Sequence, residues 1–145
     1  MAQAKLYFED VSEGSELPTL VKDPINETQL VRYAGASGDF NPIHTVHNFA
    51  VKAGFKDGVI GHGMLSMGFA GQFITDWVGV KTLKKIAVQF RAVSKPKDVI
   101  TIKGSVTKKY TDGGKNLVDC AYLATNQNGD KIIIGSATAE LPLKN

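Results

Sequence analysis

The sequence predicts an α+β protein in which an antiparallel sheet wraps around one long central helix. Three observations support this. Helical and turn-rich segments fill the first half, alternating strand patterns fill the second half, and residues 63–78 are apolar on almost every helical face. The 145 residues fit one domain, 1–145, because no repeat, low-complexity stretch or linker divides them. The apolar fraction of 43% and the charged fraction of 21% are typical of a globular protein with its own core.

The first half begins with an expected edge strand over residues 17–23, followed by two short helices. Asn26 starts a capping-box pattern, so the first helix should begin directly after it. We expect that helix to run to about Ala34, where the two glycines of segment 35–38 break it. The second short helix is expected over residues 45–53.

Segment 63–78 is the most apolar helical candidate of the chain. Its polar residues form no broad hydrophilic stripe, and a helix that is apolar nearly all round is buried. In a chain of this size another part must therefore cover it. Its apolar members are Met64, Leu65, Met67, Phe69, Ala70, Phe73, Ile74, Trp77 and Val78.

The second half provides that cover through segments that alternate with a period of two, which is typical of strands. Turn residues separate these segments. A meander of long strands around one buried helix is the hot-dog arrangement. The strands are expected at 86–93, 100–106, 118–122 and 132–141, and the turns at 94–98, 112–114 and 128–129.

Charge and composition exclude several classes of function. The net charge of +3 is a mild excess spread over many lysines. It fits an ordinary hydrated surface, and it also fits weak attraction of an anionic ligand such as a phosphate-bearing carrier. The chain has no dense basic run with interleaved aromatic residues, so we expect no nucleic-acid partner.

The sequence also predicts a cytoplasmic protein without a membrane segment. No apolar run approaches the roughly 20 residues that span a bilayer. Residues 1–10 have neither the apolar core nor the cleavage pattern of a signal peptide. Cys120 is the single cysteine, so it forms no internal disulfide, and its place in a strand predicts a buried, inert thiol.

The loop 38–44 carries the densest group of candidate catalytic residues. Asp39 and His44 lie five positions apart, Gly38 permits unusual backbone angles, and Pro42 stiffens the path between the two side chains. A carboxylate and an imidazole directed at one small volume suit acid–base chemistry on a water molecule. The alternative is that Asp39 only caps the next helix and that Asn41-Pro42 is an ordinary turn.

A second candidate is segment 61–63, Gly-His-Gly, directly before the long helix. The backbone N–H of Gly63 can there stabilise a developing oxyanion at the positive end of the helix dipole, although close packing alone also explains a glycine. His62 is expected to be a structural hydrogen-bonding residue, and His47 to lie on the exposed face of the second short helix. His44 and His47 are three positions apart, but no further ligand accompanies them, so we expect no metal site.

Residues 33–44, Tyr-Ala-Gly-Ala-Ser-Gly-Asp-Phe-Asn-Pro-Ile-His, resemble the hydratase 2 motif of the MaoC-like (R)-specific enoyl-CoA hydratases. Residues 61–65, Gly-His-Gly-Met-Leu, resemble the start of that family's central helix, and the chain has the length of a single-hot-dog member. It looks most similar to subunits of (3R)-hydroxyacyl-carrier-protein dehydratases and to short-chain hydratases of polyester synthesis. The resemblance implies reversible hydration of trans-2-enoyl thioesters to (3R)-3-hydroxyacyl thioesters, in fatty-acid or polyhydroxyalkanoate metabolism.

The resemblance also implies roles for individual residues. Asp39 and His44 are then the catalytic pair that activates one water for syn addition. The backbone N–H of Gly63 polarises the thioester carbonyl, and Asn41 supports the loop by hydrogen bonds. No cofactor is implied, because coenzyme A or acyl carrier protein only carries the substrate.

Family members form homodimers, so the resemblance implies a homodimer in which two sheets meet edge to edge. A heterodimer with a homologous, inactive subunit stays open. Met64, Met67 and Phe40 are the candidates that we expect to line an acyl tunnel near the interface.

Two alternative functions remain open from the sequence. A hot-dog thioesterase generally places its carboxylate on or beside the central helix, where this chain has only Asp76, near the far end. A non-catalytic subunit is expected to lose the acid or the histidine of the loop, and this chain keeps both.

Overall fold

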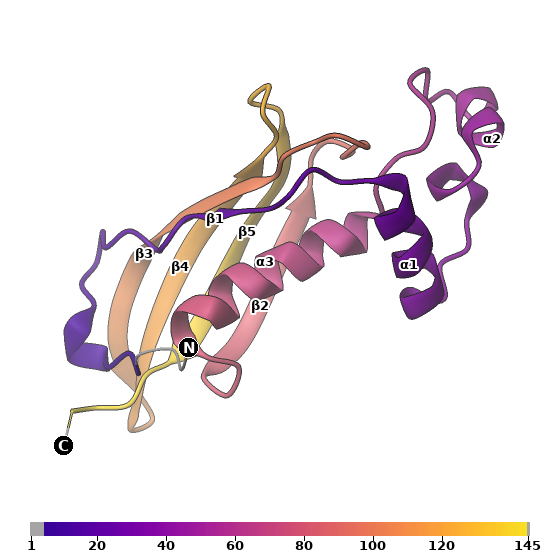
Figure 1. The fold of residues 1–145 in the computed structure, drawn as a ribbon. Helices are drawn as coiled ribbons and strands as arrows, with labels where there is room; N and C mark the ends of the chain where they lie inside the picture. The colour runs from indigo at the N-terminus through magenta and orange to yellow at the C-terminus, as the bar shows by residue number, and fades with distance from the viewer. Residues whose placement is uncertain (1–4, 145) are drawn as a thin grey trace.

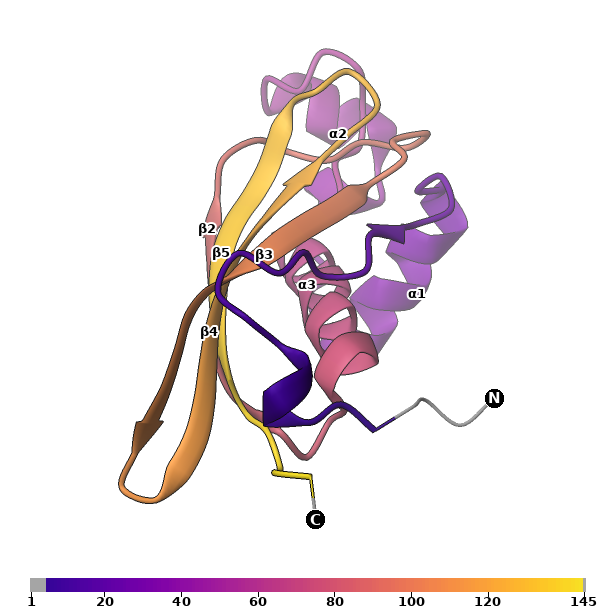
Figure 2. The ribbon, with the colours of Figure 1, turned by 90° about the vertical axis from the view of Figure 1, so that its left-hand side faces the viewer.

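A five-stranded antiparallel sheet curls around the helix α3 (Gly63–Val78) in the computed structural model, which describes residues 5–144 (Figure 1). The strands lie in the order β1-β3-β4-β5-β2, and Figure 2 shows α3 in the hollow on one side of them. This confirms the predicted α+β class and hot-dog arrangement. The strands are β1 (Leu20–Val21), β2 (Leu83–Phe90), β3 (Thr101–Asp112), β4 (Lys115–Thr125) and β5 (Lys131–Glu140).

All four long strands occur where alternation predicted them, but their ends differ. β3 and β4 extend past the predicted 100–106 and 118–122, and the parts of both strands near their connecting turn are partly exposed on both faces and show no alternation. They meet in a two-residue turn, Gly113-Gly114, whose φ angles of 54° and 77° suit glycine. β2 begins and ends three residues before the predicted 86–93.

The predicted edge strand is correctly placed but shorter, since β1 covers only Leu20–Val21 beside β3. The helix α1 (Glu27–Ser37) begins as predicted, with the Asn26 side chain accepting a hydrogen bond from the Gln29 N–H at 2.9 Å. Its predicted end at Ala34 is wrong. The helix continues through Gly35 to Ser37, because one helical glycine costs only about 1 kcal/mol. Gly38 ends it, and the Gly38 N–H donates to the Ala34 carbonyl at 2.9 Å.

The second short helix, α2 (His47–Lys52), starts two residues later than predicted because residues 42–44 form a separate 3₁₀ turn, η2 (Pro42–His44). Another 3₁₀ turn, η1 (Phe8–Asp10), opens the described part of the chain. The first four residues of segment 1–10, where we expected no signal peptide, lie outside the described residues. Within 5–144, none of the helices has both the length and the apolarity needed to cross a membrane.

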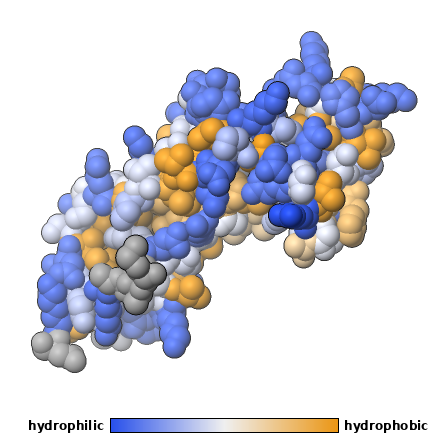
Figure 3. Space-filling view, in the orientation of Figure 1, coloured by the Kyte–Doolittle hydropathy of each residue, from blue (hydrophilic) through white to orange (hydrophobic). Residues whose placement is uncertain are grey.

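The helix α3 has the predicted bounds, but it is buried on one face only. Leu65, Phe69, Phe73 and Ile74 pack into the curled sheet, whereas Met64 on the opposite face is 55% exposed. Figure 3 views this outer face and shows apolar patches between hydrophilic side chains. The expected burial of α3 is therefore confirmed for the face that the sheet covers, whereas Met64 on the outer face is left uncovered by residues 5–144.

Tyr122 joins three elements on the inner face of the sheet. Its ring lies against the neighbouring Gly135 on β5, and its hydroxyl donates a 2.9 Å hydrogen bond to the carbonyl of Ala87 on β2. Phe73 of α3 contacts the same ring edge to face, with centroids 6.0 Å apart. A side chain at position 135 would overlap the tyrosine ring, so this glycine is required by close approach.

Gly135→Ala should therefore lower the free energy of unfolding by about 2 kcal/mol or more, because the added methyl displaces Tyr122. Gly35→Ala is the matched control. It adds a methyl to an exposed helical position with nothing within 4 Å, and it should stabilise the protein by about 1 kcal/mol. Urea unfolding of both variants measures the two changes, and equal effects would contradict the assigned contact.

Cys120 is buried, as predicted, and burial raises the pKa of its thiol from an ordinary value near 9 to about 11. The unfolded chain therefore releases this proton first as the pH rises, so the thiol's contribution to stability is lost above pH 9. Between pH 8 and pH 10 the wild type should lose about 1 kcal/mol more unfolding free energy than Cys120→Ala. The packing defect of the alanine variant is independent of pH. If the free energies of unfolding of the two proteins, measured in urea, fell in parallel from pH 8 to pH 10, the assignment would be contradicted.

Candidate active site

Successive tight turns shape the loop after α1. Gly38 ends the helix with a φ of 74°, and the carboxylate of Asp39 then accepts a hydrogen bond from the Asn41 N–H at 3.2 Å. The Asn41 side chain in turn accepts from the Ile43 N–H at 3.2 Å, at the start of η2. These side-chain-to-backbone bonds are typical of turn-forming Asp and Asn, and they bring the side chains of Asp39 and His44 together.

Asp39 and His44 face each other with 3.7 Å between Oδ2 and Nε2. This distance is too long for a direct hydrogen bond, but one oxygen atom fits at hydrogen-bonding distance from both. The side chain of His44 is 9% exposed and that of Asp39 is 51% exposed. The pair therefore joins a buried imidazole to a hydrated carboxylate.

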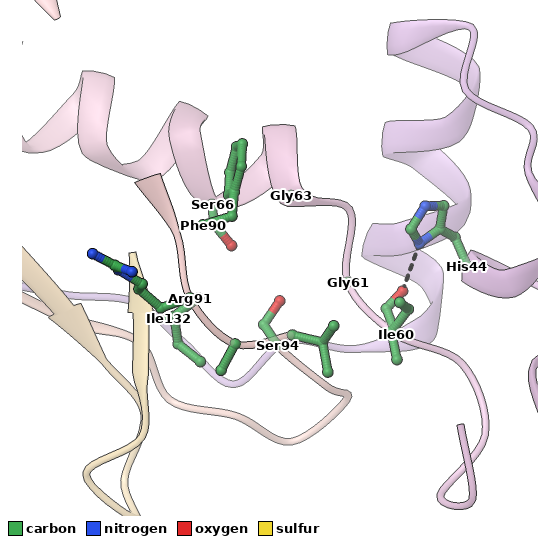
Figure 4. Close-up of a pocket in the computed structure, with 11 residues that line it drawn as sticks. His44, Ile60, Gly61, Gly63, Ser66, Phe90, Arg91, Ser94 and Ile132 are labelled. Carbon is green, nitrogen blue, oxygen red and sulfur yellow. Dashed lines mark hydrogen bonds between the residues drawn. The ribbon is translucent and has the colours of Figure 1, made fainter. Parts of the chain in front are cut away.

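The protonation of His44 follows from its other contact. Its Nδ1 lies 2.9 Å from the carbonyl oxygen of Ile60, the hydrogen bond drawn in Figure 4. A carbonyl oxygen only accepts, so Nδ1 carries the proton in the neutral ring. Nε2 is then an unprotonated base that faces Asp39.

His62 completes the buried part of the cluster. Its ring stacks on His44 with centroids 3.8 Å apart, and its Nε2 lies 3.2 Å from the carbonyl oxygen of Asp39. Burial lowers the pKa of His62 below its ordinary value. The expected hydrogen bond is present, whereas the stacking was not foreseen. His47 is exposed at the start of α2, as predicted.

A cavity of about 250 Å³ opens beside His44 at the first turn of α3 (Figure 4). Gly63 lines it, and among residues 5–144 the Gly63 N–H has no hydrogen-bond acceptor. A Cβ at this position would lie 3.3 Å from the Phe90 ring, so glycine keeps the helix N-terminus accessible. The lining residues besides His44 and Gly63 are Ile60, Gly61, Ser66, Phe90, Arg91, Ala92, Val93, Ser94 and Ile132.

Residues 11–128 match the family model described as MaoC like domain. The chain belongs to the MaoC-like family. It is 33% identical to an (R)-specific enoyl-CoA hydratase of Rhodospirillum rubrum, covering 95% of this chain and 93% of that protein. It is 29% identical to a 3-hydroxybutyryl-CoA dehydratase of Methylorubrum extorquens, covering 96% of this chain and 86% of that protein. The solved structure of the R-hydratase PhaJ1 from Pseudomonas aeruginosa superposes with a TM-score of 0.84 at 25% identity, over 97% of this chain and 88% of that one.

Two polar residues of this MaoC-like cavity carried no signal in the sequence. Ser66 lies one helical turn after Gly63, on the same face of α3, and Ser94 follows β2. Both serines are nearly fully buried. An isolated serine in an apolar helix or a turn has no distinctive pattern, and only the fold places residue 94 against Gly61, whose N–H donates to the Ser94 carbonyl at 2.7 Å.

The residues expected to line an acyl tunnel do not line this cavity, and a tunnel near a subunit interface stays a prediction. Met64, Met67 and Phe40 are not among the residues that line the cavity, and Met64 and Phe40 are exposed. Gly63 and Ser66 face the cavity, so Met64, about 100° further round the helix than Gly63, turns to the outer face.

Asp39, His44 and His62 bring one potential metal-ligand atom each within 4.8 Å of one another. Their orientation does not suit a metal ion. The two imidazole planes are 22° apart and stacked, so their in-plane lone pairs lie in two nearly parallel layers and do not converge on one point. One nitrogen of each ring also donates to a carbonyl already. Of the two histidines that the sequence offered, only His44 belongs to this cluster, and His47 does not.

Proposed function

We propose that this MaoC-like chain is a hydro-lyase that reversibly hydrates trans-2-enoyl thioesters to (3R)-3-hydroxyacyl thioesters. The observation that carries the proposal is the 3.7 Å gap between Asp39 Oδ2 and the unprotonated Nε2 of His44, next to a cavity at the N-terminus of α3. The family and the activities named for the similar proteins support it. Fatty-acid or polyhydroxyalkanoate metabolism is the setting that we propose.

In the proposed reaction Asp39 and His44 hold one water molecule between them. Nε2 of His44 takes a proton from the water while the water oxygen bonds to C3 of the enoyl group. The electrons of the C2–C3 double bond move onto the thioester oxygen, which the Gly63 N–H stabilises. A proton from the Asp39–His44 pair then bonds to C2 on the face of the enoyl group that the water attacked, which gives syn addition. Dehydration is the reverse of these steps.

The substrate carrier and the assembly are also part of the proposal. Hydration involves no net oxidation or reduction, so the reaction needs no redox cofactor. Coenzyme A or acyl carrier protein serves only to carry the acyl group. Arg91 is a cation in the cavity wall that suits a phosphate-bearing carrier. β2 pairs with β5 along one edge, and no strand within 5–144 pairs with its other edge. We propose that a second copy, or a homologous subunit, pairs there.

The purified protein should remove the enoyl absorbance of crotonyl-CoA without releasing free thiol, and it should form (3R)-3-hydroxybutyryl-CoA. Asp39→Asn keeps the shape of the side chain but removes the carboxylate, so it should lower kcat by about 100-fold or more. The test follows absorbance and thiol in parallel for both proteins.

Each outcome of that assay has a definite meaning. Thiol release by the wild type would identify a thioesterase and contradict hydration. Full turnover by Asp39→Asn would remove Asp39 from the chemistry. Inactivity of the wild type on enoyl thioesters of four to twelve carbons, on either carrier, would contradict the proposal for the chain by itself.

Asn41 should act only through the loop that it shapes. Asn41→Ala removes the acceptor for the Ile43 N–H, so it should lower kcat about tenfold with little change in KM. Asn41→Ser can form the same turn more weakly and should lose less activity. Steady-state kinetics separate the two constants, and a change confined to KM would mean that Asn41 contacts the substrate.

A further inference from the structure

We propose that His62 is a positioning residue that stays neutral and holds Asp39 and His44 in their relative orientation. The inference rests on the proposed function for its kinetic consequence, but its structural content does not depend on that function. His62 directly precedes α3 and is 1% exposed. A buried imidazole in contact with both members of the pair has a more specific task than filling space.

The contact with Asp39 determines the tautomer of His62. The carbonyl oxygen of Asp39 only accepts, so Nε2 of His62, 3.2 Å away, must carry the proton. Nδ1 is then unprotonated, and among the described residues this buried atom has no hydrogen-bond partner. A second proton on Nδ1 would create a buried charge without an acceptor, which is costly. The ring is therefore kept neutral in a single tautomer.

The contact with His44 determines the plane of the catalytic imidazole. The two rings are stacked with centroids 3.8 Å apart and planes 22° apart. The Ile60 carbonyl holds one edge of the His44 ring, and His62 covers its face, so Nε2 of His44 stays directed at Asp39. Because His62 is neutral, His44 can take up a proton during turnover without repulsion from a second cation.

The remaining neighbour keeps the His62 ring in place. Tyr33 of α1 packs against it edge to face, with centroids 4.9 Å apart and planes at 61°. The titratable groups that face His62 are therefore Tyr33 from α1 and Asp39 and His44 from the loop. Asp39 meets the imidazole through its backbone carbonyl, and within residues 5–144 no carboxylate accepts a hydrogen bond from the ring.

The first test is nitrogen-15 NMR of the histidine rings in the wild type, which needs no assay. The chain has only three histidines, so their ring signals can be assigned by single substitutions. At pH 7 we expect His44 protonated on Nδ1 only and His62 protonated on Nε2 only. A charged His62, or one protonated on Nδ1, would overturn the proposal whether or not the protein hydrates enoyl thioesters.

The second test separates the two contacts with matched variants. His62→Gln keeps an amide N–H for the Asp39 carbonyl but removes the stacked ring, and His62→Phe keeps a ring but removes the donor. Each should lower kcat on the enoyl thioester about 10- to 100-fold with KM within about threefold, since His62 does not line the cavity. His47→Gln is the control, an exposed histidine whose replacement should leave kcat unchanged.

The readouts also distinguish positioning from mere packing. In His62→Gln the unstacked His44 ring can turn away from the Ile60 carbonyl, so its signals should split between two tautomers. In His62→Phe a ring still covers His44, so its signals should remain those of Nδ1–H. Variants that keep wild-type kcat with a melting temperature near that of the wild type would overturn the proposal. If either variant fails to fold, the tautomers of the wild type decide. If the wild type has no hydratase activity, the proposed function fails, and the ring signals still test the positioning.

Discussion

Packing of α3 into the hollow of the curled sheet is the constraint on which the rest of the structure depends. Phe73 and Tyr122 meet at the centre of that contact, and Gly135 leaves the room that the tyrosine ring needs. The same packing places the first turn of the helix at one end of the sheet. There the Gly61 N–H bonds to the Ser94 carbonyl, so the N-terminus of α3 opens onto the cavity beside the end of β2.

The candidate site is a junction between two chain segments that this packing brings together. The loop 39–44 is joined to segment 60–62 by three hydrogen bonds, two of which use histidine rings. In the third, the Ile60 N–H donates to the Ile43 carbonyl at 3.2 Å. Backbone carbonyls thus determine which nitrogen of each imidazole carries the proton. Nε2 of His44 is left free to accept a proton from water. A proton acceptor held in this way needs no reorganisation before it acts.

The environment of the pair suits proton transfer to and from water. His44 is shielded on one face by His62 and lines the cavity, whereas the carboxylate of Asp39 stays half exposed to solvent. The carboxylate is thus open to water, and Nε2 of the neutral imidazole is directed at it. The exposed outer face of α3 and the free edge of β2 lie next to this cavity, so a second subunit at that edge would contribute to its surroundings.

The sequence by itself determined the α+β class, the bounds of the central helix, the four long strands and the loop with Asp39 and His44. These features depend on residues close together in the chain, where alternation, helical periodicity and turn chemistry act. Only the tertiary structure decided the strand ends, the one-sided cover of α3, the roles of Ser66 and Ser94 as cavity walls and the stacking of His62 on His44. These depend on segments distant in sequence coming into contact, and no local pattern encodes which faces meet.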